Sequence, residues 1–223
     1  KLAITARLQS SGFQGAPEYV DFTYDTLFEK NYSGPGIYAS ALAELAATTI
    51  EHQIFDPISD YLHNVFHPSR DLVWGGDAIR WAAGMVAQFT VESNLREELR
   101  QDFFDVISAE KPDLVAAHSL CTLVTFDFLH NDARAKNITP FEYLTFGSQI
   151  NNVFVRSRVW PGRLMMPNVR SWTHLYNPQD HVFTADISIP DTTNFASVKT
   201  PSAAGHSPVR TADGPGYLDH PNT

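Results

Sequence analysis

The segment that decides the fold runs from Pro112 to Leu129 and reads PDLVAAHSLCTLVTFDFL. A short apolar run, Leu114 to Ala117, is followed at once by a His-Ser pair and then by an apolar stretch of helical length. This order predicts a strand, a tight turn and a helix, which is the elbow that presents a nucleophilic serine above a sheet. Ser119 is therefore the candidate nucleophile. The alternative is that Ser119 is an ordinary cap at the N-terminus of the following helix.

The residues around the turn bear on this choice. Ala117 and Cys121, two positions before and after Ser119, are both small, as a tight turn requires. Neither is glycine, so backbone strain at the serine would fall on residues that carry a Cβ atom. The first N–H groups of a helix are unpaired and lie at its positive end. We therefore expect the N–H of Leu120 to bind the oxyanion of a tetrahedral intermediate.

The composition narrows the class of protein. Of the 223 residues, 43% are hydrophobic and 18% are charged, which suits one folded domain around one core. The formal net charge of -9 argues against nucleic acid as a partner, and no apolar run has the length of a transmembrane helix. Cys121 is the only cysteine, which excludes an internal disulfide and a cysteine-based zinc site. We expect a cytoplasmic location.

Helical and strand-like segments alternate along the chain, which predicts an α/β fold with a mostly parallel central sheet flanked by helices. We expect strands beginning near residue 19 (19–28) and covering 114–117, 143–146, 172–176 and 195–200, and helices over 1–9, 78–89, 94–109 and 120–129. The helix over 94–109, capped near Asn94, would present Leu95, Leu99, Phe103 and Ile107 on one face. Sites in parallel sheets gather at the carboxyl ends of strands, so the chemistry is expected in the loops that follow them.

Three motifs resemble the α/β-hydrolase superfamily, in particular its lipase- and esterase-like members. They are AHSLCT over 117–122, TFGS over 145–148 and WTHLYNPQD over 172–180. The resemblance covers Pro112 to His206 well and the earlier half of the chain only loosely. It implies a serine hydrolase that cleaves a carboxylic ester of a small molecule through an acyl-enzyme, with no metal or organic cofactor.

The resemblance also implies the other members of a catalytic triad. In this superfamily the nucleophile, the acid and the histidine follow one another along the chain. Asp180 fits the acid, and His206, in the loop after the last expected strand, fits the base better than His220. His206 would take the proton of Ser119 while Asp180 holds the imidazole tautomer.

Three further histidines receive other roles. His118 and His181 adjoin the serine and the acid in sequence and are expected to line the substrate site or to pack. His174 alternates with strand positions and is expected to be structural.

Two features depart from the superfamily pattern. No His-Gly pair, the usual source of the second oxyanion donor, occurs in the chain. In the superfamily this pair follows an early strand, and Lys1 to Phe13 looks like the helix that comes after that strand. Either the strand is absent from the N-terminal side, or the second oxyanion donor comes from elsewhere. A helix-rich insertion over 36–90, interpreted as a cap within a single domain over 1–223, also precedes the elbow.

These departures leave two alternatives open. One is a non-catalytic binding protein of the same fold, and the other is an acyltransferase that uses the same triad. The sequence does not fix the oligomeric state or the acyl chain.

Overall fold

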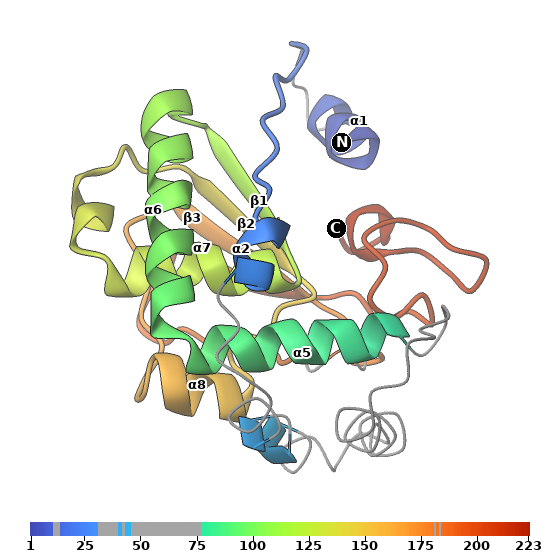
Figure 1. The fold of residues 1–223 in the computed structure, drawn as a ribbon. Helices are drawn as coiled ribbons and strands as arrows, with labels where there is room; N and C mark the ends of the chain where they lie inside the picture. Colours follow the sequence, from blue (N-terminus) through green and yellow to red (C-terminus); the bar gives the residue numbers. More distant parts are fainter. Residues whose placement is uncertain (11–13, 31–39, 42, 46–76, 181, 183) are drawn as a thin grey trace.

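A computed structural model describes residues 1–10, 14–30, 40–41, 43–45, 77–180, 182 and 184–223 (Figure 1). The helices are α1 (Leu2–Ser10), α2 (Asp25–Lys30), α5 (Asp77–Val91), α6 (Ser93–Glu110), α7 (Leu120–Asn131) and α8 (Val153–Val159), with short 3-10 helices η2 (Ala133–Asn137) and η3 (Tyr217–Asp219). The strands are β1 (Leu114–His118), β2 (Glu142–Phe146), β3 (Ser171–Tyr176) and β4 (Phe195–Lys199).

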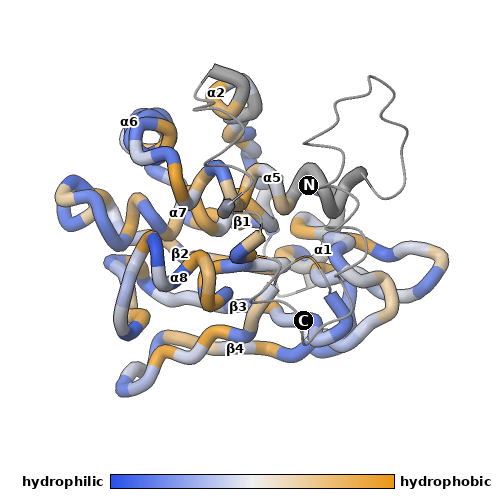
Figure 2. Tube along the Cα trace, turned by 60° about the horizontal axis from the view of Figure 1, so that its bottom comes forward, coloured by the Kyte–Doolittle hydropathy of each residue, from blue (hydrophilic) through white to orange (hydrophobic). Residues whose placement is uncertain are grey.

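The four strands form one parallel sheet in the order β1-β2-β3-β4 (Figure 2). In its register Ala117, Thr145, His174 and Ser197 lie side by side, one on each strand. Because all strands run the same way, their carboxyl ends meet at one edge of the sheet, and the loops that follow β1, β3 and β4 begin there. The expected α/β class with a parallel sheet flanked by helices is confirmed.

Most of the expected elements are present, with boundaries that move by one or two residues. The strand expected to begin at Tyr19 is wrong. Residues 16–24 are irregular, and the chain enters α2 at Asp25. A strand needs a neighbour for its backbone hydrogen bonds, and among the described residues this segment has none. Phe22 and Tyr24 instead pack against the core, where the Phe22 ring lies 5.6 Å from that of Phe103.

Helix α6 has the amphipathic face that its sequence predicts. Its buried residues are Leu95, Leu99, Phe103 and Ile107, spaced by one turn each. The helix begins at Ser93, and its N-cap position is Glu92, two residues before Asn94, with no side-chain hydrogen bond to the first turn. It ends at Lys111, whose left-handed backbone (φ 45°) sends an N–H back to the Ile107 carbonyl.

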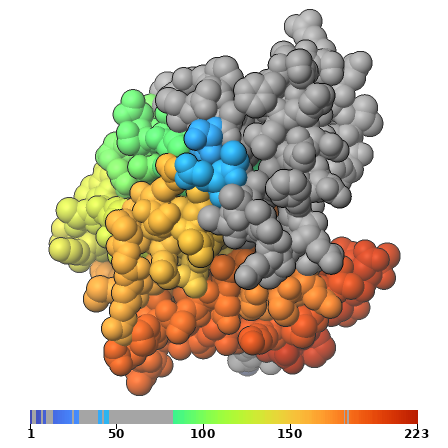
Figure 3. All heavy atoms as spheres, turned by 90° about the horizontal axis from the view of Figure 1, so that it is seen from below, coloured from blue at the N-terminus to red at the C-terminus, as the bar shows by residue number. Residues whose placement is uncertain are grey.

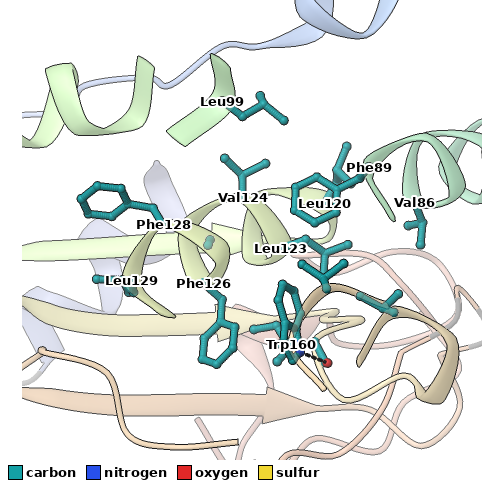
Figure 4. Close-up of a cluster of buried hydrophobic side chains, with 14 of the residues drawn as sticks. Val86, Phe89, Leu99, Leu120, Leu123, Val124, Phe126, Phe128, Leu129 and Trp160 are labelled. Atoms are coloured by element: carbon teal, nitrogen blue, oxygen red, sulfur yellow. Dashed lines mark hydrogen bonds between the residues drawn. The ribbon is translucent and has the colours of Figure 1, made fainter. Parts of the chain in front are cut away.

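Helix α7 is the centre of the core, and nine of its twelve residues are buried. Phe128 packs on Phe103 of α6 at 5.5 Å, and Phe126 packs on Trp172 of β3 at 5.4 Å. Phe126 also packs on Trp160 at 5.1 Å (Figure 4). The helix is therefore covered on opposite sides by α6 and the sheet. Full burial of each such ring contributes roughly 1.5–3 kcal/mol. This packing fixes the helix that begins directly after Ser119.

The expected insertion over 36–90 lies mainly outside the described residues. Within it, α5 confirms the helix expected over 78–89, and Glu44 pairs with Arg158 of α8. Residues 40–41 and 43–45 lie against the α8 region on the face seen from below (Figure 3). In the described part of the chain, no helix has the length and hydropathy needed to cross a bilayer.

The two ends of the described chain lie close together. Helix α1 contacts η3 (Figure 1), and Ile4 packs with Phe146, Tyr217 and Leu218 in a small apolar cluster next to the carboxyl end of β2. The last twenty residues are thereby fixed against the edge of the sheet where the strands end.

Candidate active site

Ser119 sits in a strained turn between β1 and α7. Its backbone has φ 52° and ψ −128°, a region that residues other than glycine rarely adopt. Such a conformation costs of order 1–3 kcal/mol and persists only where the surroundings impose it. Here the Ser119 N–H is held by the Phe146 carbonyl at 3.1 Å, and Ala117 before the turn is buried. The strain expected at Ser119 is present.

The Ser119 side chain does not cap α7. It occupies the N-cap position, but it accepts no hydrogen bond from the helix, and its hydroxyl has no partner among the described residues. The first turn is closed by other groups, since the Thr122 N–H and hydroxyl both donate to the Ser119 carbonyl, at 2.9 and 2.6 Å. The ordinary cap interpretation therefore loses the contact on which it depends.

His206 and Asp180 form a short hydrogen bond. Nδ1 of His206 lies 2.7 Å from Oδ2 of Asp180, whose side chain is fully buried. An ionised carboxylate can only accept, so Nδ1 carries a proton, and in the neutral form of the imidazole Nε2 keeps a lone pair. Burial acts to raise the pKa of Asp180, but the hydrogen bonds from His206 and Tyr217 outweigh it and hold that pKa below its ordinary value. The acid is therefore ionised at neutral pH and fixes the imidazole tautomer.

The His206 ring lies next to the elbow. Its centroid is 4.6 Å from that of His118, the residue before Ser119. A Cβ atom on Gly147, which has φ 59° and directly follows β2, would come within 2.8 Å of His206 Cε1. Because Gly147 has no side chain, it leaves space for the His206 ring, which lies near the carboxyl ends of β1 and β2.

The expected hydrogen bond between Ser119 and a histidine is not formed. Within the described part of the chain, the Ser119 hydroxyl has no hydrogen-bond partner, and neither has the buried Nε2 of His206. A buried polar atom without a partner is costly and calls for an explanation. Catalytic hydrogen bonds are often long or poorly aligned before substrate binds, and they tighten in the complex with substrate.

His118 contacts His206 through its ring and through the backbone carbonyl of His206. Its Nε2 lies 3.0 Å from the His206 carbonyl, which can only accept, so Nε2 carries the proton. The His118 ring also stacks on Phe146 at 4.9 Å. Burial and the neighbouring His206 lower the pKa of His118 to about 4, so the ring is neutral at physiological pH. Its expected role in substrate binding stays a prediction, and its Nε2 edge is already engaged.

Asn177 holds the loop that carries His206, a role that sequence reasoning missed. Its Nδ2 donates to the carbonyls of Ser202 and Gly205, at 2.8 and 3.0 Å. Its Oδ1 accepts from the N–H groups of Ser202 and Gln179, at 3.1 and 3.0 Å. All four hydrogen-bonding positions of this buried amide are used. The residue just before His206 is therefore tied to the loop of the acid, and the only sequence signal was an Asn-Pro pair typical of a turn.

The other residues singled out in the sequence are His220, His181 and Leu120. Asp180 pairs with His206 and not with His220, whose Nε2 faces the Pro201 carbonyl at 3.3 Å and whose Nδ1 accepts from the Asn222 N–H. His181 lies outside the described residues. Leu120 is the first residue of α7, so its N–H has no partner within the helix and can receive an oxyanion. In the described ranges, no three His, Cys, Asp or Glu side chains are grouped so that they could hold a metal ion.

His174 lies away from the proposed chemistry, within β3. It is fully buried, and its Nδ1 lies 3.0 Å from Thr145 Oγ1 on the neighbouring strand. Burial lowers the pKa of His174 from 6.5 to about 4. It packs as a neutral side chain in the sheet.

Acid should destabilise the fold through His174. Because its folded pKa lies below its unfolded value, the unfolded chain binds the proton first as the pH falls from 6.5 towards 4. The free energy of unfolding should therefore decrease by about 2 kcal/mol between about pH 7 and pH 5 from this residue alone. Urea unfolding at a series of pH values measures it.

A pair of variants isolates this contribution. His174→Asn removes the titrating ring and should reduce the pH dependence by the contribution of His174, while the contribution of His118, whose pKa is also lowered to about 4, remains. His130→Asn, at an exposed position of α7, is the matched control and should behave like the wild type. An unchanged slope in His174→Asn would show that the ring is not buried in its neutral form.

Comparison of the chain with protein-family models, with curated proteins and with solved structures found no match in any of the three.

Proposed function

We propose that this protein is a serine hydrolase of the α/β-hydrolase type, which cleaves a carboxylic ester through an acyl-enzyme on Ser119. The observation that carries the proposal is the Asp180–His206 hydrogen bond, which leaves Nε2 of His206 beside the elbow without a partner among the described residues. The unpaired hydroxyl and strained backbone of Ser119 support it, because strain of this kind is retained where geometry serves function.

The reaction follows from these positions. Nε2 of His206 takes the hydroxyl proton as Ser119 Oγ attacks the ester carbonyl carbon. The carbonyl oxygen becomes an oxyanion, which the Leu120 N–H at the start of α7 stabilises. His206 then returns the proton to the leaving alkoxide as the C–O bond breaks. A water molecule, deprotonated by the same nitrogen, cleaves the acyl-enzyme and restores Ser119.

A fluorophosphonate probe tests the proposal directly. It reacts with an activated serine by displacement of fluoride, so the folded protein should gain one phosphonyl group, located on Ser119 by peptide mass spectrometry. Protein unfolded in urea is the control and should not react. Reaction at another serine would exclude Ser119 as the nucleophile. Failure of the folded protein to react at all would favour a non-catalytic binding protein.

The products distinguish hydrolysis from acyl transfer, which uses the same residues. With an aryl ester as substrate, a hydrolase should release the free acid even when a short alcohol is added. Predominant formation of the new ester at low alcohol concentration would identify an acyltransferase instead.

A further inference from the structure

Tyr217 reaches the acid of the proposed site from the far end of the chain. It is 2% exposed and begins η3, where its N–H donates to the Ser207 carbonyl at 3.1 Å. The turn before it is held by Asp219, whose Oδ1 accepts from the Gly216 N–H at 2.6 Å. Its ring packs on Phe146 at 5.9 Å. The backbone and the ring are thus placed independently of the hydroxyl.

The Tyr217 hydroxyl donates to Oδ2 of Asp180 at 2.6 Å. This is the oxygen that accepts from His206 Nδ1 at 2.7 Å, while the other oxygen accepts from the Val182 N–H at 2.9 Å. The carboxylate is therefore held at both oxygens, and it cannot rotate away from His206 without losing two further bonds. Hydrogen bonds to a buried charge are among the stronger ones in proteins.

We propose that Tyr217 is a positioning residue of the active site, which holds the Asp180 carboxylate in the orientation that directs Nε2 of His206 towards Ser119. This inference rests on the proposed function for its kinetic consequence, although the contact itself does not. Burial and the Asp180 charge raise the pKa of Tyr217, so the hydroxyl stays a donor throughout the working pH range.

The chain offers a matched control in Tyr143. Tyr143 is 1% exposed, and its hydroxyl lies 2.6 Å from Thr125 Oγ1, between β2 and α7. Both tyrosines are therefore buried, and both hydroxyls are hydrogen-bonded. Replacement by phenylalanine removes one oxygen from each and leaves the ring. Tyr217→Phe loses the hydrogen bond to Asp180, whereas Tyr143→Phe loses a hydrogen bond to Thr125.

Steady-state ester hydrolysis should separate the two variants. Tyr217→Phe should lower kcat by about tenfold at nearly unchanged KM, because the lost bond orients the acid and does not contact substrate. Tyr143→Phe should keep the wild-type kcat. Urea unfolding should show similar losses of stability in both, as expected for two buried hydroxyls. Equal kcat values in both variants, with an active wild type, would reduce Tyr217 to a packing residue.

A second readout does not depend on activity. The proton between His206 Nδ1 and Asp180 should give a far-downfield resonance in the proton NMR spectrum of the full chain. Tyr217→Phe should shift or broaden it, and Tyr143→Phe should leave it in place. A resonance unchanged in Tyr217→Phe would overturn the inference. The resonance could shift in Tyr217→Phe while the wild type hydrolyses no ester. That result would support the contact between Tyr217 and Asp180 and reject the proposed function instead.

Discussion

Ser119→Ala should abolish reaction with the fluorophosphonate probe and lower ester turnover by about 10⁴-fold or more. The hydroxyl oxygen is the only heavy atom lost, and it makes no hydrogen bond to any residue that the structure describes. The stability of the variant should therefore stay close to that of the wild type. Rates of ester hydrolysis and urea unfolding curves, measured on the same preparation, check both parts. Wild-type turnover in Ser119→Ala would show that the acyl-enzyme forms elsewhere or not at all.

A glycine at the same position provides the control for the strain at the elbow. Ser119→Gly should be as inactive as Ser119→Ala, but more stable than Ser119→Ala by about 1 kcal/mol. The reason is that alanine keeps a Cβ at φ 52°, where glycine has no steric penalty. Equal stability of the two variants would mean that the turn stores no strain.

Asp180→Asn should lower turnover by about 10⁴-fold with little change in KM. In the wild type, Oδ2 of Asp180 accepts from both His206 Nδ1 and the Tyr217 hydroxyl. An amide lacks the charge that stabilises the imidazolium. If its NH₂ group turns towards His206, it forces the imidazole proton onto Nε2. That nitrogen can then no longer accept the proton of Ser119.

Asp191→Asn is the matched control for charge. Asp191 is exposed, pairs with Arg163 at 2.6 Å and has φ 61°, a conformation that asparagine tolerates well. Its turnover should equal that of the wild type. Full activity in Asp180→Asn would remove Asp180 from the mechanism and leave its bond to His206 as a structural contact.

The sheet, the central helix and the elbow could be predicted because their signals are local. An apolar run of four residues followed by small residues and a helix is readable within one segment, and α6 shows its buried face by spacing alone. The strand expected at Tyr19 failed for the opposite reason. A β-rich composition does not form a strand unless another strand lies beside it, and that condition is not written in the segment itself.

The supporting residues of the site show a second limit. Asn177 contacts residues 25 and 28 positions later in the chain, and Tyr217 contacts an acid 37 positions earlier. Neither contact leaves a local pattern, because each depends on how two loops meet beyond the carboxyl ends of the strands. Asp180 and His206 were chosen from chain order in a resemblance, and the structure brings them together, whereas the groups that hold them required coordinates.

The position of β4 has a consequence for how activity should be lost on heating. Among the described strands it pairs with β3 alone, most of its side chains face outward, and the loop that carries His206 follows it. Edge elements with few buried contacts open at a lower free-energy cost than a central helix such as α7. Inactivation should thus precede the bulk melting of the molecule, with the nucleophile still in place and the base withdrawn.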